Sequence, residues 1–104
     1  MNAYFFKMTK EERKLIADFR KLVSSHTKGN PIKSYKITKK LGIDGLTIRK
    51  LTHYLRAMGK CPIIATSEGY YISYSKKEIT NQINSLQERA YSIEEAASGL
   101  KKFL

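Results

Sequence analysis

The sequence concentrates basic side chains in its middle third. Residues 28–60 contain nine Lys and Arg residues and one acidic residue, Asp44. Ammonium and guanidinium groups donate hydrogen bonds to phosphate oxygens and to acceptor atoms on base edges. The whole chain of 104 residues has a formal net charge of +11. This excess predicts a polyanionic partner, nucleic acid ahead of an anionic membrane, with solubility alone as the competing explanation.

Residues suited to catalysis or metal binding are few and scattered. His26 and His53 have no carboxylate or cysteine nearby at metal-ligand spacing. The single cysteine, Cys61, excludes an intramolecular disulfide and a cysteine-built metal site. The six glycines lie apart along the chain and form no phosphate-binding loop. We therefore expect no enzyme, no cofactor and no metal site.

Nothing in the sequence predicts a membrane or secretory segment. No stretch approaches the roughly 20 apolar residues of a membrane span. Residues 1–8 are too short and too aromatic a segment for a secretory signal. Together with the lone cysteine, these features predict a cytoplasmic protein.

A first helix is predicted over residues 10–27. Thr9-Lys10-Glu11-Glu12 has the pattern of a capping box, with a hydroxyl followed three residues later by a carboxylate. Apolar residues then recur at helical spacing from Leu15 to Val23. Gly29-Asn30-Pro31 is expected to stop this helix.

Two shorter helices follow. Ser34 is the expected cap of the second helix, and Gly42 ends it because a left-handed C-terminal residue favours glycine. Asp44 is the expected N-cap of the third helix, which closes at Gly59. The apolar stripe of the third helix is predicted to consist of Ile48, Leu51, Leu55 and Met58.

The period of the apolar residues changes after residue 60. Ile63-Ile64-Ala65-Thr66 and Tyr70-Tyr71-Ile72-Ser73-Tyr74 are β-prone runs, separated by the turn residues Ser67-Glu68-Gly69. They predict one β-hairpin, and Ile32-Lys33 is a candidate short strand. The expected fold class is mainly α with a small β-hairpin (α+β), followed by a long C-terminal helix.

Four segments within the expected helices and hairpin form a recognisable pattern. They are Ile37-Thr38-Lys39-Lys40-Leu41-Gly42-Ile43, Thr47-Ile48-Arg49-Lys50-Leu51, Leu55-Arg56-Ala57-Met58-Gly59 and Gly69-Tyr70-Tyr71-Ile72. Together with the order helix, short strand, helix, turn, helix and hairpin, they resemble the winged helix-turn-helix domain of biotin-repressor-type regulators, over about residues 10–74. The resemblance departs at Thr38, where the family usually has alanine. It implies a DNA-binding domain over residues 1–74, whose third helix enters the major groove.

The third helix supplies the candidate base-reading residues. Arg49 and Lys50 are suited to donate to guanine or phosphate, and Leu46 is suited to contact a thymine methyl group. A solvated face without a partner is the alternative. The five candidates that are expected to be exposed are Leu46, Thr47, Arg49, Lys50 and His53.

Candidate contacts to the DNA backbone surround this helix. They are Lys33, Ser34, Tyr35, Lys36, Lys39, Lys40 and Lys60, which carry ammonium or hydroxyl groups. In the hairpin, or wing, the candidates are Thr66, Ser67 and Tyr70. Because Glu68 stands at the tip, we favour a structural role for the wing over a phosphate contact.

Residues 75–104 are predicted to form a heptad helix for dimerisation. Residues 76–103 as one helix would measure about 42 Å, longer than the roughly 25–30 Å expected for the 74-residue body. A coiled coil between two copies would cover the seam and match a two-fold DNA site. Alternatively, the Ser92-Ile93-Glu94-Glu95 capping pattern breaks the helix near Tyr91. The seam consists of Ile79, Ile83, Leu86, Ala90, Ile93, Ala97 and Leu100.

The leading hypothesis is a sequence-specific, homodimeric double-stranded DNA binder that acts in transcription regulation or in replication or mobile-element control. One alternative is a protein-interaction module that uses the winged helix and the C-terminal helix. Another is a single-stranded nucleic-acid binder in which Tyr70, Tyr71 and Tyr74 stack on bases. Because alternate hairpin residues face opposite ways, at least one of these tyrosines is expected in the core.

Overall fold

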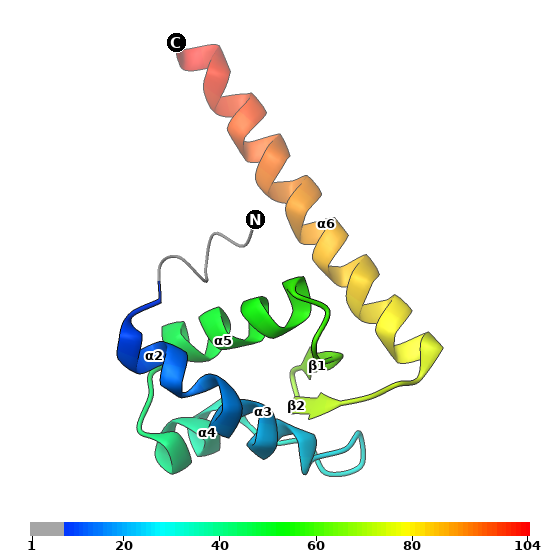
Figure 1. Cartoon of the computed structure of the whole chain (residues 1–104). Helices are drawn as coiled ribbons and strands as arrows, with labels where there is room; N and C mark the ends of the chain where they lie inside the picture. Colours follow the sequence, from blue (N-terminus) through cyan, green and yellow to red (C-terminus); the bar gives the residue numbers. More distant parts are fainter. Residues whose placement is uncertain (1–7) are drawn as a thin grey trace. The chain divides into compact units, whose positions relative to one another are not determined.

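The computed structural model describes residues 8–104 and confirms the predicted fold class, mainly helical with one two-stranded antiparallel hairpin (Figure 1). Residues 1–7 lie outside the described residues. They include most of the N-terminal segment for which the sequence predicts no secretory signal. The contacts divide the chain into one unit that ends at Tyr74 and a second unit over Ser75–Leu104. The elements are α2 (Lys10–Lys14), α3 (Ile16–Ser24), α4 (Ser34–Leu41), α5 (Gly45–Ala57), β1 (Ile63–Thr66), β2 (Gly69–Ile72), α6 (Lys76–Leu100) and the 3-10 helix η1 (Lys101–Phe103).

The first predicted helix is shorter than expected and is divided in two. Thr9 and Glu12 form the predicted capping box. A tight turn at Leu15, whose N–H donates to the Glu12 carbonyl at 3.0 Å, separates α2 from α3. The prediction of a helix to residue 27 is wrong, because the Ser24 and Ser25 hydroxyls donate to carbonyls of the last turn and compete with the helical pattern.

The turn between α4 and α5 forms as the glycine and aspartate predict. Gly42 adopts the left-handed conformation, φ 65°, and ends α4. Asp44 accepts the Thr47 N–H at 2.8 Å and caps α5. Ser34 is not the cap of α4; Lys33 occupies that position and Ser34 is the first helical residue. At the far end of α5, Gly59 has φ 63°.

The core of the first unit lies between α3, α4, α5 and the hairpin. Met58, which was predicted to face the core, is instead 50% exposed because it follows the last residue of α5. Thr52 and Tyr54 are buried although they lie outside the predicted apolar stripe, and the Thr52 hydroxyl donates to the Ile48 carbonyl at 2.8 Å. The largest fully buried side chains are Phe19, Val23, Ile32, Ile37, Ile48, Leu51, Leu55 and Ile63.

The hairpin pairs β1 with β2, and Ile63 stands opposite Ile72. The predicted strand at Ile32 forms as a single antiparallel bridge to Tyr70, with N–H···O distances of 2.9 and 2.8 Å in the two directions. Gly69 lies directly against this segment, with φ 135°, and a Cβ there would lie 2.6 Å from the Ile32 carbonyl oxygen. Only glycine fits both the backbone conformation and the space.

We expect Gly69→Ala to destabilise the first unit. The substitution must either force the Ile32 bridge apart or strain the backbone, and the loss should be about 3 kcal/mol of unfolding free energy, the upper end for such conformations. Urea unfolding followed by circular dichroism measures it. Gly29→Ala is the matched control because nothing lies within 4 Å of a Cβ at Gly29. Equal stability of the two variants would contradict the role of Gly69.

The second unit is one continuous helix followed by η1. Ser75 caps α6 by accepting the Glu78 N–H at 3.4 Å. The alternative in which the helix breaks near Tyr91 is wrong, since α6 runs from Lys76 to Leu100. At roughly 1.5 Å per residue, α6 is about 37 Å long. No helix within residues 8–104 has the length and apolarity needed to cross a membrane.

Candidate nucleic-acid interface

One face of α5 carries exposed side chains along its length. Leu46, Arg49 and His53 are spaced three and four residues apart, which places them on one side of the helix. All three are exposed, and Leu46 is 49% exposed although it is apolar. A Cβ built on Gly45 would lie 3.7 Å from an Arg49 Nη1 atom, so the guanidinium lies over the first turn of α5. A cation, an imidazole and an apolar group therefore line this face.

Two of the predicted base-reading residues, Thr47 and Lys50, contact Glu12 instead of being fully exposed. Thr47 is not exposed as predicted: it retains 8% of its surface, and its hydroxyl donates to Oε2 of Glu12 at 3.1 Å. Lys50 is half-buried, and its Nζ donates to Oε1 of Glu12 at 3.4 Å. Glu12 belongs to α2, so the contact joins segments more than 30 residues apart. The helical pattern of α5 alone carries no signal of it.

Glu12 and Asp44 are the carboxylates that organise the start of α5. The Thr9 N–H lowers the pKa of Glu12 most, and Thr47 and Lys50 act in the same direction. The Thr47 N–H likewise lowers the pKa of Asp44. Both side chains are therefore charged at neutral pH. The capping pattern identified both residues, but only the structure shows that Glu12 also reaches α5.

α4, which carries several exposed basic residues, packs against α5 and is joined to it by the Gly42 turn. Tyr35 is among the most exposed aromatic residues of the first unit. The predicted backbone-contact residues at Lys33, Ser34, Tyr35, Lys36, Lys39 and Lys40 are all exposed. Six neighbouring donors are thus available for an anionic ligand on and just before one short helix.

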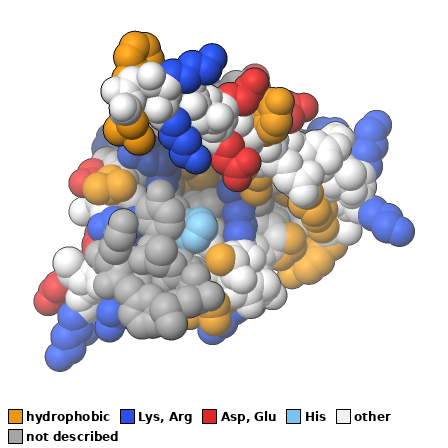
Figure 2. All heavy atoms as spheres, turned by 90° about the horizontal axis from the view of Figure 1, so that it is seen from above, with side chains coloured by type: hydrophobic (Ala, Val, Ile, Leu, Met, Phe, Trp, Pro, Cys, Tyr) orange, Lys and Arg blue, Asp and Glu red, His pale blue; other side chains and the backbone are white. Residues whose placement is uncertain are grey.

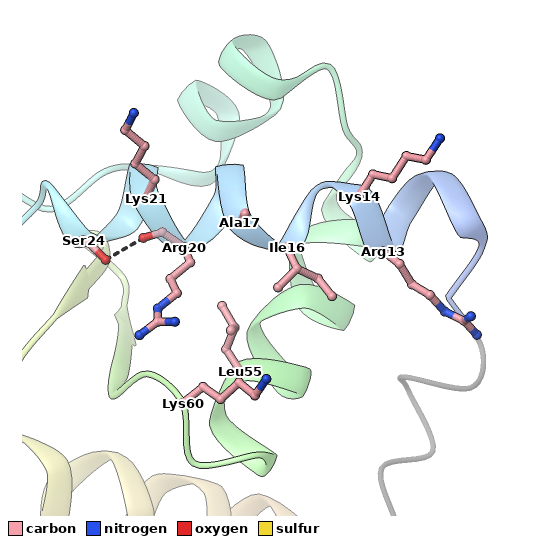
Figure 3. Close-up of a pocket in the computed structure, with 9 residues that line it drawn as sticks. All are labelled: Arg13, Lys14, Ile16, Ala17, Arg20, Lys21, Ser24, Leu55 and Lys60. Atoms are coloured by element: carbon pink, nitrogen blue, oxygen red, sulfur yellow. Dashed lines mark hydrogen bonds between the residues drawn. The ribbon is translucent and has the colours of Figure 1, made fainter.

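Lys60 does not belong to this group. Its ammonium lies 5.6 Å from the centroid of the Tyr54 ring, past the C-terminal end of α5. It borders a cleft between α3 and α5, which Leu55 also lines (Figure 3). Leu55 follows Leu46 by two and a half helical turns, so the two side chains leave α5 on opposite sides. Lys60 is therefore separated from the exposed α5 face.

The cleft contains basic residues that the sequence analysis did not single out. In Figure 3, the side chains of Arg13 and Arg20 extend to the same side of their helices as Ile16, whereas Lys14 and Lys21 point away. Within the described part of the chain, the lining residues include five Lys and Arg and no acidic residue. Figure 2 also shows Lys and Arg side chains on several separate parts of the visible surface. Positive charge is thus not confined to α4 and α5.

The wing residues have mainly structural contacts. The Thr66 hydroxyl accepts the Glu68 N–H at 3.1 Å within the turn. Ser67 is exposed, and Tyr70 is half-buried against the core. Of the other hairpin tyrosines, Tyr71 is buried and Tyr74 is exposed. The three tyrosines therefore do not present one common stacking surface.

Other reactive side chains are separate from this face. His26 Nδ1 lies 2.8 Å from the Asn30 carbonyl oxygen in the turn after α3. Cys61 is buried, and burial raises the pKa of its thiol. Across residues 8–104, no three His, Cys, Asp or Glu side chains are placed to share a metal ion.

The heptad seam of α6 retains large exposed apolar side chains. Ile83 is 45% exposed and Ile93 is 70% exposed. α6, which the structure describes throughout, has no buried residue. Of the other predicted seam positions, Ile79 and Leu86 are half-buried, and Ala90, Ala97 and Leu100 are exposed.

Comparison of the chain with protein-family models, with curated proteins and with solved structures gave no match. The functional assignment therefore depends on the chain's own residues.

Proposed function

We propose that this chain is a double-stranded DNA-binding protein of the winged helix-turn-helix type, sequence-specific and homodimeric, with a role in transcription regulation or in replication or mobile-element control. The observation that carries the proposal is the exposed face of α5, with Leu46, Arg49 and His53, together with the exposed lysines of α4, the helix that packs against α5. We further propose a cytoplasmic location and no membrane partner.

The chemistry of this surface suits a major groove. A recognition helix contacts base edges with its N-terminal half, where Leu46 and Arg49 lie. Arg49 has the planar donor pair that suits O6 and N7 of guanine. The exposed cations of α4 suit the phosphates beside the groove, which set the register but carry no sequence information. Lys60 and the wing have a smaller part in this proposal.

Self-association through α6 completes the proposal. Ile83 and Ile93 stay exposed on a helix that is about 37 Å long, and a heptad seam of this kind is typical of coiled coils. A second copy of the chain would cover the seam and bring two α5 helices to one duplex. Two reading helices related by a two-fold axis match a palindromic site.

A protein-interaction module is the second candidate function. The exposed apolar seam of α6 favours it, because the same seam suits a helix from another protein. A single-stranded nucleic-acid binder has less support, since Tyr71 is buried and unable to stack on a base.

The test is selection of bound sequences from a random duplex pool by the purified protein at several salt concentrations. The proposal predicts enrichment of a two-fold symmetric site, and the salt dependence of its affinity counts the phosphate contacts. Equal affinity for unrelated duplexes at moderate salt would refute sequence-specific binding. Absence of duplex binding would refute the function and leave the protein-interaction module.

A further inference from the structure

Glu12 is placed where α2 meets the start of α5. Its Oε1 accepts the Thr9 N–H at 2.8 Å and the Lys50 ammonium at 3.4 Å. Its Oε2 accepts the Thr47 hydroxyl at 3.1 Å. One carboxylate thus caps α2 and holds two successive turns of α5.

Lys50 lies at the edge of the exposed α5 face. It follows Arg49 directly and precedes His53 by three residues, so its side chain leaves the helix near that of His53. Glu12 draws the Lys50 ammonium toward α2, and the side chains of the pair are only 15% and 16% exposed. Because the Glu12 carboxylate offsets the charge of Lys50 and draws its ammonium toward α2, Lys50 is less available to a phosphate than an unpaired ammonium.

We propose that Glu12 is a positioning residue that withholds Lys50 from DNA phosphates and so limits sequence-independent attraction relative to base reading. This inference rests on the proposed function. Phosphate contacts contribute equally on every duplex, whereas base contacts contribute only on the correct one. Each added phosphate contact steepens the salt dependence of affinity, by about 0.9 in the log–log slope. By holding Lys50 in an ion pair, Glu12 therefore favours discrimination between DNA sequences.

Glu12→Gln tests the charge while it preserves most of the geometry. A glutamine at this position also completes a capping box, and its carbonyl oxygen accepts one of the hydrogen bonds. We expect the variant to bind an unrelated duplex roughly 3- to 10-fold more tightly at 0.1 M salt, with a slope steeper by about 0.9 for each bound copy, hence by about 1.8 for a dimer. The ratio of selected-site to unrelated-duplex affinity should fall.

Lys50→Gln and the double variant Glu12→Gln with Lys50→Gln complete the design. If Glu12 withholds Lys50, Lys50→Gln alone changes the slope little and the double variant loses the gain of Glu12→Gln. Thermal unfolding checks that each variant is folded. Should Glu12→Gln fail to fold, Lys50→Gln still tests the inference, because it leaves the Thr9 and Thr47 contacts of Glu12 in place and a less steep slope in this variant overturns the inference.

The outcomes separate this inference from the function itself. If the wild type binds its site and Lys50→Gln alone lowers the slope by about 0.9 for each bound copy, Lys50 contacts phosphate directly and the inference is overturned. An unchanged slope in a folded Glu12→Gln variant overturns it as well. If the wild type binds no duplex, both the function and the inference fail.

Discussion

Arg49→Ala should weaken binding to the selected duplex by about 5- to 150-fold for each half-site, corresponding to roughly 1–3 kcal/mol for each lost bidentate base contact. The guanidinium stands on the exposed face of α5 over the first helical turn. Truncation removes its donors without opening the core. Preference at one base pair of each half-site should relax, while affinity for unrelated duplexes should fall less. Fluorescence anisotropy with the selected site and single-base variants of it measures both effects.

Arg20→Ala is the charge-matched control for this prediction. Arg20 is exposed on α3 and lines the cleft that lies across α5 from Leu46. Its loss lowers the net charge by the same amount but should leave base preference intact. Equal effects of the two variants would mean that net charge alone drives binding. No effect of Arg49→Ala on function would favour the protein-interaction module.

The parts of the fold that the sequence predicts well depend on short-range interactions. The Thr9–Glu12 capping box, the Asp44 cap and the left-handed Gly42 each involve atoms at most four residues apart. Such signals are visible in a single sequence because the partner group belongs to the neighbouring backbone. They correctly place α4, α5 and the turn between them.

The errors arise where a distant segment decides the environment of a side chain. Thr47 and Lys50 were expected to be exposed because the apolar stripe of α5 lies on the other side of the helix. Glu12, on α2, covers that edge. Lys60 was predicted as one of the backbone contacts around α5, and it stands past the C-terminal end of that helix, whereas the other candidates lie on or just before α4. Tertiary contacts of this kind leave no periodic trace in the sequence.

The candidate site is therefore narrower than the sequence analysis predicts. Among the five base-reading candidates, Leu46, Arg49 and His53 are fully on the surface. The predicted contacts to the DNA backbone on and just before α4 are all exposed, as the sequence predicts. The apolar pattern of α5 thus predicts which side of the helix is exposed, and the contacts of Glu12 on α2 determine how exposed Thr47 and Lys50 are.

Ile83→Asp should abolish self-association and, with it, tight binding to a two-fold site. Ile83 lies on the heptad seam of α6 and is 45% exposed. Because α6, described over its whole length, has no buried residue, the substitution disrupts no packed core within the described part of the chain. In a coiled coil the carboxylate that this substitution introduces would be buried between the two helices without a partner. The free-energy cost of burying this charge exceeds the stabilisation that the apolar contact of Ile83 provides. Separated copies would contact one half-site each, and the affinity for the full site should fall by a factor of about 10² or more.

Asn84→Asp is the matched control because it adds the same charge one residue away, at an exposed position off the seam. Analytical ultracentrifugation measures the mass of each variant, and anisotropy on full and half sites measures binding. We expect Ile83→Asp to behave as a monomer that binds a half-site as well as a full site, and Asn84→Asp to match the wild type. A wild type that is itself monomeric would contradict the dimer. A monomeric Ile83→Asp that keeps full-site affinity would instead mean that each copy reads its half-site independently and that the α6 seam has a different partner.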